Sequence, residues 1–418
     1  MLKASMPNKK SFPGKFIYLI LIIASVLFVS CDSHSIDMPV EPVIQSRGQI
    51  LSVASLGTYT AGTIQTFVNV AAGGAQTGIA PRFDVDAYKV IYITIDTKGN
   101  LVKASGALFI PRGQNNLSLI SLHHGTMSAR ADAPSQNPTT NALEGLIAAS
   151  LGYYSLEADY LGLGESTILH PYINEKSSAE TIIDFIRAGR TFAIAKNTAL
   201  NGQVFLAGYS EGGYVTLAAQ KEIEKNHVGE INITASAPMA GPYDLNLTAR
   251  TILQNTTYPQ PGYLAFIFVS YDNIYGWNKV NEIFSSTYAS IIPSLFDGSK
   301  NLNQINASLT TDLTKLFKKN FVDSFLAGNE TDVNAALTGN SLIEWTPIAP
   351  VKLFHGDSDD YVPYQNSVEA YNSFKSRGAN VELETIHGGT HLTAAVPSII
   401  GAVLWFESFR LQKTIAVR

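Results

Sequence analysis

One stretch near the middle of the chain limits the possible folds most strongly. Residues 204–213 read VFLAGYSEGG, so an apolar run short enough for a buried strand leads directly into Gly-x-Ser-x-Gly. Residues 214–222 have the composition of a helix. Glycines around a serine permit a sharp, strained turn that leaves its hydroxyl exposed at the end of a strand. The stretch therefore predicts that Ser210 is a nucleophile; a Gly- and Ser-rich loop that matches the pattern by chance is the alternative.

Apolar runs alternate with helical segments on both sides of Ser210. In segment 178–196 an apolar face repeats at spacings of three and four residues, and Gly189 within it allows close approach to a sheet. This alternation predicts an α/β fold with a mostly parallel sheet covered by helices on both faces. The turn at 98–100 predicts an antiparallel hairpin at the N-terminal edge. The other strand candidates are 88–96, 101–111, 117–123, 153–159, 231–238, 351–355 and 381–386, and the other helix candidates are 59–70 and 392–410.

The alternation stops between residues 243 and 347. This stretch contains helix-like pieces such as 311–325 and an aromatic run at 263–271. We therefore expect a helical lid inserted over one end of the sheet. Its aromatic run either lines an apolar pocket or packs in the core of the lid itself. The domain scheme that follows is a first part of the core at 49–243, the lid insertion at 244–346 and a second part of the core at 347–418.

The N-terminus has the pattern of a secretory signal peptide. Four lysines precede the apolar run 16–29, which is too short to span a membrane comfortably. The only cysteine of the chain, Cys31, comes soon after this run and resembles the lipobox of bacterial lipoproteins, in which cleavage precedes a lipidated cysteine. We expect a signal peptide at 1–30, a lipid on Cys31 and a flexible tether at 31–48. A signal peptide or membrane anchor with an incidental cysteine is the alternative.

The charge of the chain argues against a nucleic-acid partner. The formal net charge is −5, and removal of residues 1–30 would take away four lysines and no acidic residue, leaving about −9. An acidic protein without long basic runs does not suit binding to a phosphate backbone. The expected product is an exported protein, held at the periplasmic or cell-surface side of a bacterial membrane only by its N-terminal lipid.

Candidate partners for Ser210 follow two strand candidates in the last third of the chain. A serine hydroxyl needs an adjacent base, and a histidine base needs an orienting carboxylate. Residues 355–363 read HGDSDDYVP and residues 387–391 read HGGTH. The residue that best fits the base is His391, just before the final helix, and His387 is the alternative. The candidate acids are Asp357, Asp359 and Asp360.

With these motifs in order, the chain resembles the α/β-hydrolase superfamily. The segments DYLGLG at 159–164 and HGT at 124–126 are similar to those of secretory-lipase-like esterases. The resemblance covers roughly 88–243 and 347–410. The acid loop of this family has the pattern His-Gly-x-x-Asp-x-x-Val-Pro, which implies that Asp359 is the acid. The triad order Ser, Asp, His along the chain agrees with this fold.

A hydrolase of this type needs two N–H donors for the oxyanion of its tetrahedral intermediate. The first expected donor is the amide of Glu211, directly after the nucleophile. The second is expected from the loop after the strand that ends at His123, with Thr126 favoured over Gly125. The side chain of Glu211 is expected to be a surface carboxylate at a helix N-terminus, without a catalytic role.

The remaining polar residues of these motifs have supporting roles in this interpretation. Asp159 and Tyr160 either line the site or hold their loop in place. No metal is expected, because the aspartates of the acid loop lack the glycine and glutamate of a calcium loop. No cofactor is expected either, since residues 162–164 lack the third glycine of a dinucleotide fingerprint. The histidines expected to support loops by hydrogen bonds are His123, His124, His170 and His355.

Together these features predict an exported serine hydrolase that cleaves small-molecule or lipid-like carboxylic esters through an acyl-enzyme. A peptidase, or a polysaccharide deacetylase or feruloyl esterase on the same fold, is the nearest alternative. A non-catalytic surface binding protein is a more remote alternative, and a missing triad member would favour it. The sequence supplies all three members of the triad.

Overall fold

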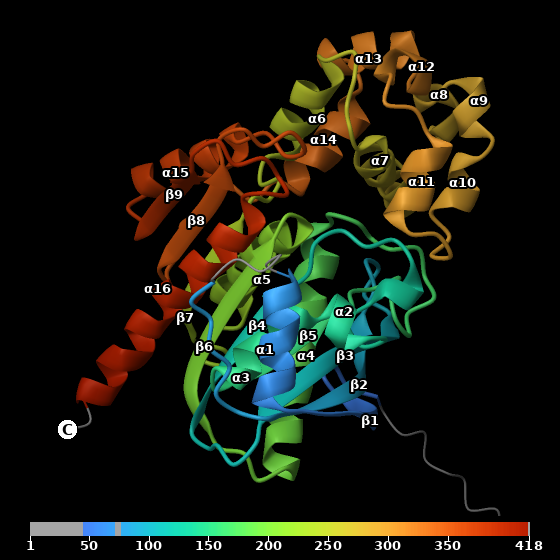
Figure 1. Cartoon of the computed structure of the whole chain (residues 1–418). Helices are drawn as coiled ribbons and strands as arrows, with labels where there is room; N and C mark the ends of the chain where they lie inside the picture. The colour runs from blue at the N-terminus through green and yellow to red at the C-terminus, as the bar shows by residue number, and fades with distance from the viewer. Residues whose placement is uncertain (1–44, 72–76, 417–418) are drawn as a thin grey trace, which may run out of the picture. The chain divides into compact units, whose positions relative to one another are not determined.

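The computed structural model describes residues 45–71 and 77–416 of the chain (Figure 1). The expected signal peptide, the lipidation site at Cys31 and most of the tether lie outside the described residues. Residues 45–418 form one compact unit by their contacts. Within the described part of the chain, no helix is both long and apolar enough to cross a membrane.

A single mixed sheet forms the centre of the protein. Its nine strands in the described residues follow the order β1-β2-β3-β5-β4-β6-β7-β8-β9. The pairs from β5 through β9 are parallel, whereas β1, β2, β3 and β5 pair in an antiparallel manner. The prediction of a mostly parallel sheet with an antiparallel N-terminal edge is confirmed. The strands are β1 (Ile50–Tyr59), β2 (Val85–Ile95), β3 (Leu101–Pro111), β4 (Leu117–His123), β5 (Tyr153–Ala158), β6 (Leu200–Tyr209), β7 (Ile233–Met239), β8 (Val351–Gly356) and β9 (Val381–Ile386).

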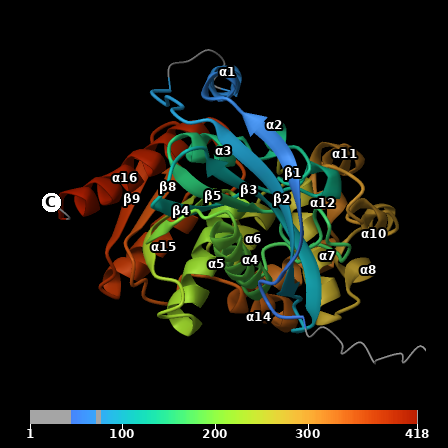
Figure 2. The same ribbon diagram turned by 90° about the horizontal axis from the view of Figure 1, so that it is seen from below.

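Helices cover both faces of this sheet, as expected for strands buried on two sides (Figure 2). One face carries α4 (Glu175–Ala195), α5 (Glu211–Asn226) and α15 (Gln365–Ser376). The other face carries α1 (Ala61–Ala71), α3 (Leu143–Ser150) and α16 (Ala395–Ala416). A short turn of 3₁₀ helix (Arg130–Asp132) and α2 (Pro138–Asn141) lie in the loop between β4 and α3.

Helix α4 shows how the sequence directs this packing. Asn174 caps it by accepting a hydrogen bond from the amide of Ser177. Its apolar face, including Ile182 and Ile186, is fully buried against the sheet. A Cβ placed on Gly189 would lie 2.9 Å from the side chain of Leu156, so the helix approaches β5 too closely for a larger residue. The role expected of Gly189 is therefore confirmed.

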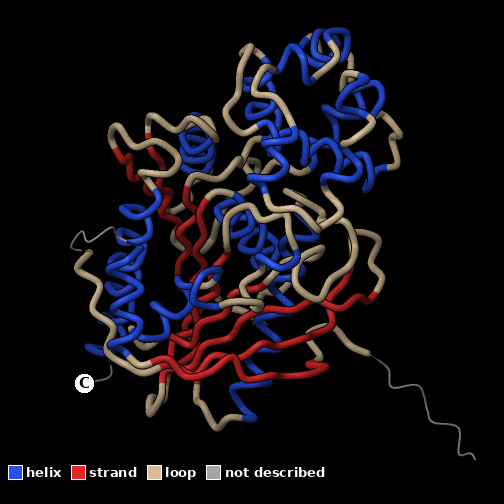
Figure 3. The backbone as a smooth tube through the Cα atoms, turned by 45° about the vertical axis from the view of Figure 1, so that its right-hand side comes forward, coloured by secondary structure: helices blue, strands red, loops and turns tan. Residues whose placement is uncertain are grey.

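Between β7 and β8 the chain leaves the sheet and forms a helical insertion (Figure 3). Its core is aromatic: Phe268 packs edge-to-face against Phe317 and Phe321. The aromatic run at 263–271 forms the middle of α7. The helices of the insertion are α6 (Leu245–Leu253), α7 (Pro261–Tyr275), α8 (Val280–Ile283), α9 (Ser286–Ala289), α10 (Ile292–Leu295), α11 (Leu302–Ser308), α12 (Leu313–Leu316), α13 (Lys319–Leu326) and α14 (Thr331–Gly339).

Three elements of the sheet and its helix layers differ from the sequence-based expectation. Strand β1 had no predicted counterpart, because most of its side chains are exposed and its sequence has no alternating apolar pattern. It exists through its antiparallel pairing with β2. Helices α3 and α15 were also not predicted. Helix α15 packs its buried residues Ala370 and Phe374 on β8 and β9.

Candidate active site

Ser210 stands on the sharp turn between β6 and α5. Its backbone has φ 61° and ψ −121°, a strained conformation for a residue with a side chain. Its amide donates to the carbonyl of Met239 on β7, which fixes the turn to the next strand. A Cβ placed on Gly212 would lie only 1.9 Å from the carbonyl oxygen of His123. The glycines of the motif are therefore required by close backbone approach, as the sequence predicts.

Three predicted residues from three separate loops meet in one hydrogen-bond chain. Ser210 Oγ lies 2.9 Å from His391 Nε2, and His391 Nδ1 lies 2.7 Å from Asp359 Oδ2. A carboxylate can only accept, so Nδ1 carries the proton and Nε2 is free to accept from the serine hydroxyl. Ser210 is 8% exposed and His391 is 4% exposed, so the chain of bonds is shielded from bulk water. This arrangement is the one that activates a serine.

Asp359 is surrounded by hydrogen-bond donors. Its Oδ1 accepts from the amides of Tyr361 and Val362, at 2.9 and 2.8 Å. Its Oδ2 accepts from His391 and, at 3.1 Å, from His355 Nε2. Burial alone would raise the pKa of Asp359, but the hydrogen bonds from the two histidines outweigh burial and lower it below the usual range. Asp359 is therefore a carboxylate at neutral pH.

The rival acid and base form a separate pair at the surface. His387 Nδ1 lies 2.8 Å from Asp357 Oδ2, and the side chain of His387 is 86% exposed. Asp360 lies nearer the site, but it only accepts from the backbone amide of His391, at 3.3 Å. Neither Asp357 nor His387 contacts Ser210 in the described residues, so the structure brings Asp359 and His391 to the serine and leaves the alternatives outside.

The two expected oxyanion donors belong to segments that lie next to Ser210. The amide of Glu211 is the first of α5, where helix amides have no intrahelical acceptor. The loop after β4 runs beside the serine: a Cβ placed on Gly125 would lie 3.7 Å from Ser210 Cβ. In the described part of the chain, neither the amide of Glu211 nor that of Thr126 donates to a backbone carbonyl. The Thr126 hydroxyl lies 2.8 Å from the hydroxyl of Tyr172, which anchors this loop.

The expectation of a surface carboxylate at Glu211 is wrong. Glu211 is 1% exposed, and its Oε1 lies 2.9 Å from His170 Nε2. His170 Nδ1 lies 2.6 Å from the carbonyl of Leu161, which can only accept, so Nδ1 carries a proton. Glu211 and His170 therefore form a buried hydrogen-bonded pair next to Ser210. The helix N-terminus suggested a surface position, but α5 begins beneath the insertion and the loop that contains His170.

Asp159 holds its loop in place rather than lining the site. It is fully buried and accepts from the amide and hydroxyl of Ser135 and from the hydroxyl of Ser105. Burial raises the pKa of Asp159, while these hydrogen bonds act in the opposite direction. The neighbouring Tyr160 has a positive φ of 66° and donates to the carbonyl of His124. These contacts connect the DYLGLG loop to the oxyanion loop.

The supporting role expected of the other histidines agrees with the hydrogen bonds. His123 Nδ1 lies 2.7 Å from the hydroxyl of Thr216 on α5. His355 Nδ1 lies 2.7 Å from the hydroxyl of Ser367 and holds Asp359 through its other nitrogen. Among the described residues, no group of three or more His, Cys, Asp or Glu is placed to hold a metal ion.

A small, mainly aromatic and aliphatic cavity opens at Ser210 beneath the insertion. Its volume is about 20 Å³, and Glu211, Tyr172 and Tyr361 contribute to its wall. From α7, Tyr263, Leu264 and Ile267 line the cavity. The residues between and after them, including Phe268, are packed in the core of the insertion. The aromatic run therefore has both of the roles that the sequence left open.

Comparison with known proteins now adds to this geometry. Residues 136–417 match the family model described as secretory lipase. The chain belongs to this family. A secreted triacylglycerol lipase of Malassezia globosa is 24% identical over 249 residues, which cover 56% of this chain and 51% of that protein. The chain spans about half the length of the curated relatives it matches.

Solved structures extend the similarity over most of this secretory lipase family member. A protein of Legionella pneumophila is 27% identical with a TM-score of 0.81, and the match covers 86% of this chain and 98% of that one. The rice cell wall degrading esterase LipA of Xanthomonas oryzae is 29% identical with a TM-score of 0.74, covering 85% and 95%. The predicted secretory-lipase-like α/β-hydrolase fold is confirmed, and these similarities support the prediction of a carboxylic-ester hydrolase.

Proposed function

We propose that the protein hydrolyses carboxylic esters through an acyl-enzyme on Ser210. One observation carries the proposal: the buried hydrogen-bond chain from Ser210 through His391 to Asp359. Membership in the secretory lipase family and the similarity to a solved esterase support the same reaction.

The acylation step follows from the positions of the protons. His391 Nε2 accepts the proton of the Ser210 hydroxyl as Oγ attacks the ester carbonyl. Asp359 keeps the other proton on Nδ1 and stabilises the positive charge that develops on the imidazole. The carbonyl oxygen becomes an oxyanion that accepts from the amides of Glu211 and Thr126. The imidazolium then returns its proton to the departing alcohol, and the acyl group stays on Ser210.

Deacylation repeats these steps with water. His391 accepts a proton from a water molecule that attacks the acyl carbonyl, and the collapse of the second intermediate returns the proton to Ser210. The Glu211 carboxyl, which neighbours the oxyanion donors, is held by its hydrogen bond to His170. An unpaired carboxylate at this position would oppose the developing oxyanion by Coulomb repulsion.

The cavity at Ser210 favours an ester with an apolar group next to its carbonyl. Its wall from α7 is aromatic and aliphatic, and we propose that the helical insertion acts as the lid that admits this group. The names of the relatives, a triacylglycerol lipase and a cell wall degrading esterase, support an ester as the substrate class.

A panel of p-nitrophenyl esters from short to long acyl chains, with feruloyl and peptidyl substrates beside them, tests this function. We expect ester hydrolysis by the wild type and a loss in kcat on the order of 10⁶ for Ser210→Ala. The matched control is His387→Ala, whose exposed side chain belongs to the separate surface pair and whose activity should be unchanged. Ester hydrolysis that survived in Ser210→Ala would disprove the mechanism, and a preference for peptidyl substrates would favour a peptidase.

We also propose that the protein is exported and anchored by a lipid on Cys31. The signal-peptide pattern before Cys31 supports both parts of this proposal. The description of the family as secretory and of a relative as secreted supports export alone. We expect the wild type to partition into the detergent phase after expression in a bacterial host with lipoprotein processing, and Cys31→Ser to move to the aqueous phase. A Cys31→Ser variant that stayed in the detergent phase would rule out lipidation as the anchor.

A further inference from the structure

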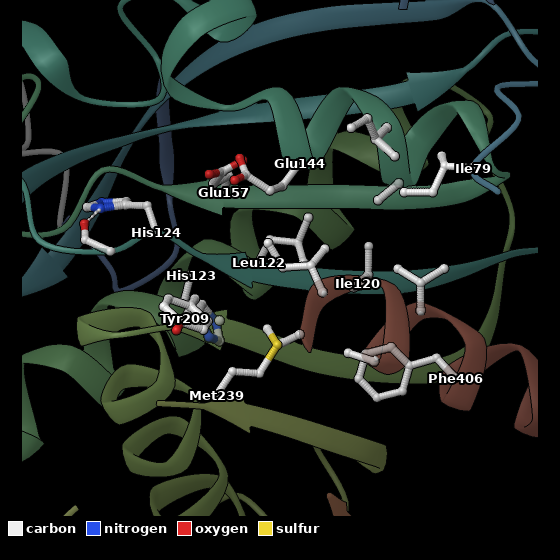
Figure 4. A pocket seen from close by; sticks show the side chains of 18 residues that line it. Ile79, Ile120, Leu122, His123, His124, Glu144, Glu157, Tyr209, Met239 and Phe406 are labelled. Carbon is white, nitrogen blue, oxygen red and sulfur yellow. Dashed lines mark hydrogen bonds between the residues drawn. The ribbon is translucent and has the colours of Figure 1, made fainter. Parts of the chain in front are cut away.

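A second and larger cavity lies on the opposite face of the sheet from α5, between the strands, α3 and α16 (Figure 4). Its volume is about 100 Å³. Its apolar wall is formed by Ile120, Leu122, Met239, Ile147 and Phe406. None of these residues belongs to the catalytic hydrogen-bond chain, and the proposed ester hydrolysis does not use this space.

Two carboxyl groups lie at one end of this cavity. Glu157 is the second-last residue of β5, and Glu144 comes from the first turn of α3; Figure 4 shows both on the same side of the pocket. Glu157 is 1% exposed, and in the described residues its Oε2 has no hydrogen-bond partner. A Cβ placed on Gly145 would lie 2.9 Å from this oxygen, so α3 packs its backbone close to the carboxyl.

The electrostatic surroundings of Glu157 contain no compensating cation among the described residues. Burial raises the pKa of Glu157 well above its ordinary value, and the carboxylates of Glu144 and Asp159 add to the rise. The amide of Gly145 acts in the opposite direction without cancelling it. Buried polar groups normally have partners, and buried charges are normally paired. With the cavity empty, these effects favour the neutral form of the Glu157 carboxyl, and a cation beside it would favour the carboxylate.

We propose that this cavity binds a small alkylammonium ligand, with its ammonium group between Glu144 and Glu157 and its alkyl chain along the apolar wall. An ammonium group supplies the hydrogen-bond donors that Glu157 Oε2 lacks and the positive charge that its surroundings lack. A carboxylate ligand would be repelled by the carboxylate of Glu144. A closed apolar cavity of about 150 Å³ admits benzene, so this smaller one suits a chain of about four carbons.

This site shares a wall with the catalytic centre. His124, Gly125 and Tyr209 line the cavity, and His124 Nδ1 donates to the carbonyl of Gly125 at 2.7 Å (Figure 4). Gly125 lies against Ser210 on its other side. The ligand is therefore bound behind the oxyanion loop and is not in the position of an ester substrate.

Calorimetry on the full-length Ser210→Ala chain at pH 7.5, with n-butylammonium chloride as the probe, tests the site without any hydrolysis. We expect one binding site and a rise in Tm, with n-butanol and n-butyrate binding at least tenfold more weakly. Failure of this binding would leave the proposed ester hydrolysis untouched, because the two measurements use different variants and readouts.

Three substitutions in the same Ser210→Ala background locate the binding. Glu157→Gln and Glu144→Gln should each lower the affinity for n-butylammonium at least tenfold. Glu144 is exposed at the rim of the cavity, so Glu144→Gln should fold and can test the site even if Glu157→Gln does not fold. Glu369→Gln, an exposed carboxyl on α15, is the matched control and should bind as before. Equal binding of n-butanol, no binding at all, or full affinity in both cavity variants would overturn the proposal.

Discussion

Asp359 differs from the acidic residues beside it in the number of donors that fix it. Two backbone amides and two histidines point at its carboxylate, whereas Asp357 makes its contacts with His387 and its loop at the surface. A group fixed in this way can hold the tautomer of His391 during the reaction. Replacing each of the two aspartates should therefore have different effects on kcat.

Replacing Asp359 by Asn removes the charge and presents a donor where His391 needs an acceptor. We expect Asp359→Asn to lower kcat by about 10⁴, because His391 would be held in the wrong tautomer. Asp357→Asn should retain activity close to that of the wild type. Both are measured with the same p-nitrophenyl ester, and circular dichroism checks that each variant is folded. A larger loss in Asp357→Asn than in Asp359→Asn would reverse the assignment.

At this scale, the sequence predicted residues that belong to a motif and missed those joined only by the fold. Ser210 and His391 stand in patterns whose chemistry requires them, and the family resemblance chose Asp359 among three aspartates. The pairing of Glu211 with His170 joins positions 41 residues apart, and no local pattern predicts it. The one sequence feature that could have drawn attention to Glu211 is its position directly after the nucleophile. Its burial is visible only in the fold, where other segments cover the start of α5.

The strand–turn–helix element around Ser210 depends on backbone contact rather than on side-chain packing. A Cβ on Gly212 would lie 1.9 Å from the carbonyl oxygen of His123 at the end of β4, and a Cβ on Gly213 would lie 2.3 Å from that of Met239. Any Cβ at these positions must displace a strand of the sheet. The glycines after Ser210 are therefore required by the packing of α5 against β4 and β7, as well as by the turn that follows β6.

A methyl group at Gly212 should damage the fold more than a methyl group elsewhere. We expect Gly212→Ala to lower the free energy of unfolding by about 3 kcal/mol or more, because the neighbouring backbone cannot move away without breaking the sheet. Gly339→Ala, at the end of α14 with open space around it, is the control and should be neutral or stabilising by up to about 1 kcal/mol. Urea unfolding measures both, and equal effects would contradict this account.

Whole elements were predicted where a period of hydrophobicity was present. The parallel strands and α4 have continuous or periodic apolar residues, so the sequence placed them. Strand β1 is mostly exposed, and half of the buried residues of α15 are polar, so neither has a clear apolar period. Both are stabilised by neighbours that are distant in the chain, which a local pattern does not show. For the same reason the sequence predicted that the insertion is helical without giving the order of its short helices.

On the scale of the whole molecule, the insertion and one flank of the sheet share a hydrophobic core. The cluster that contains Phe268 of α7 also contains Leu353 of β8 and Phe374 of α15. The cluster extends to α5 through Leu217 and Ala218. An insertion with this continuity cannot unfold without exposing part of the sheet, although it lies outside the strand–helix alternation.

This continuity predicts one unfolding transition for the insertion and the sheet. Trp277 lies in the insertion and Trp405 lies on α16, so two single-tryptophan variants report on the two regions by fluorescence. We expect their urea midpoints to coincide. Phe268→Ala, which removes a ring from the insertion core, should lower both midpoints through a loss of about 3–5 kcal/mol. If only the Trp277 signal shifted, or if the two midpoints separated, the insertion would be an independent unit that could open over Ser210 without loss of the sheet.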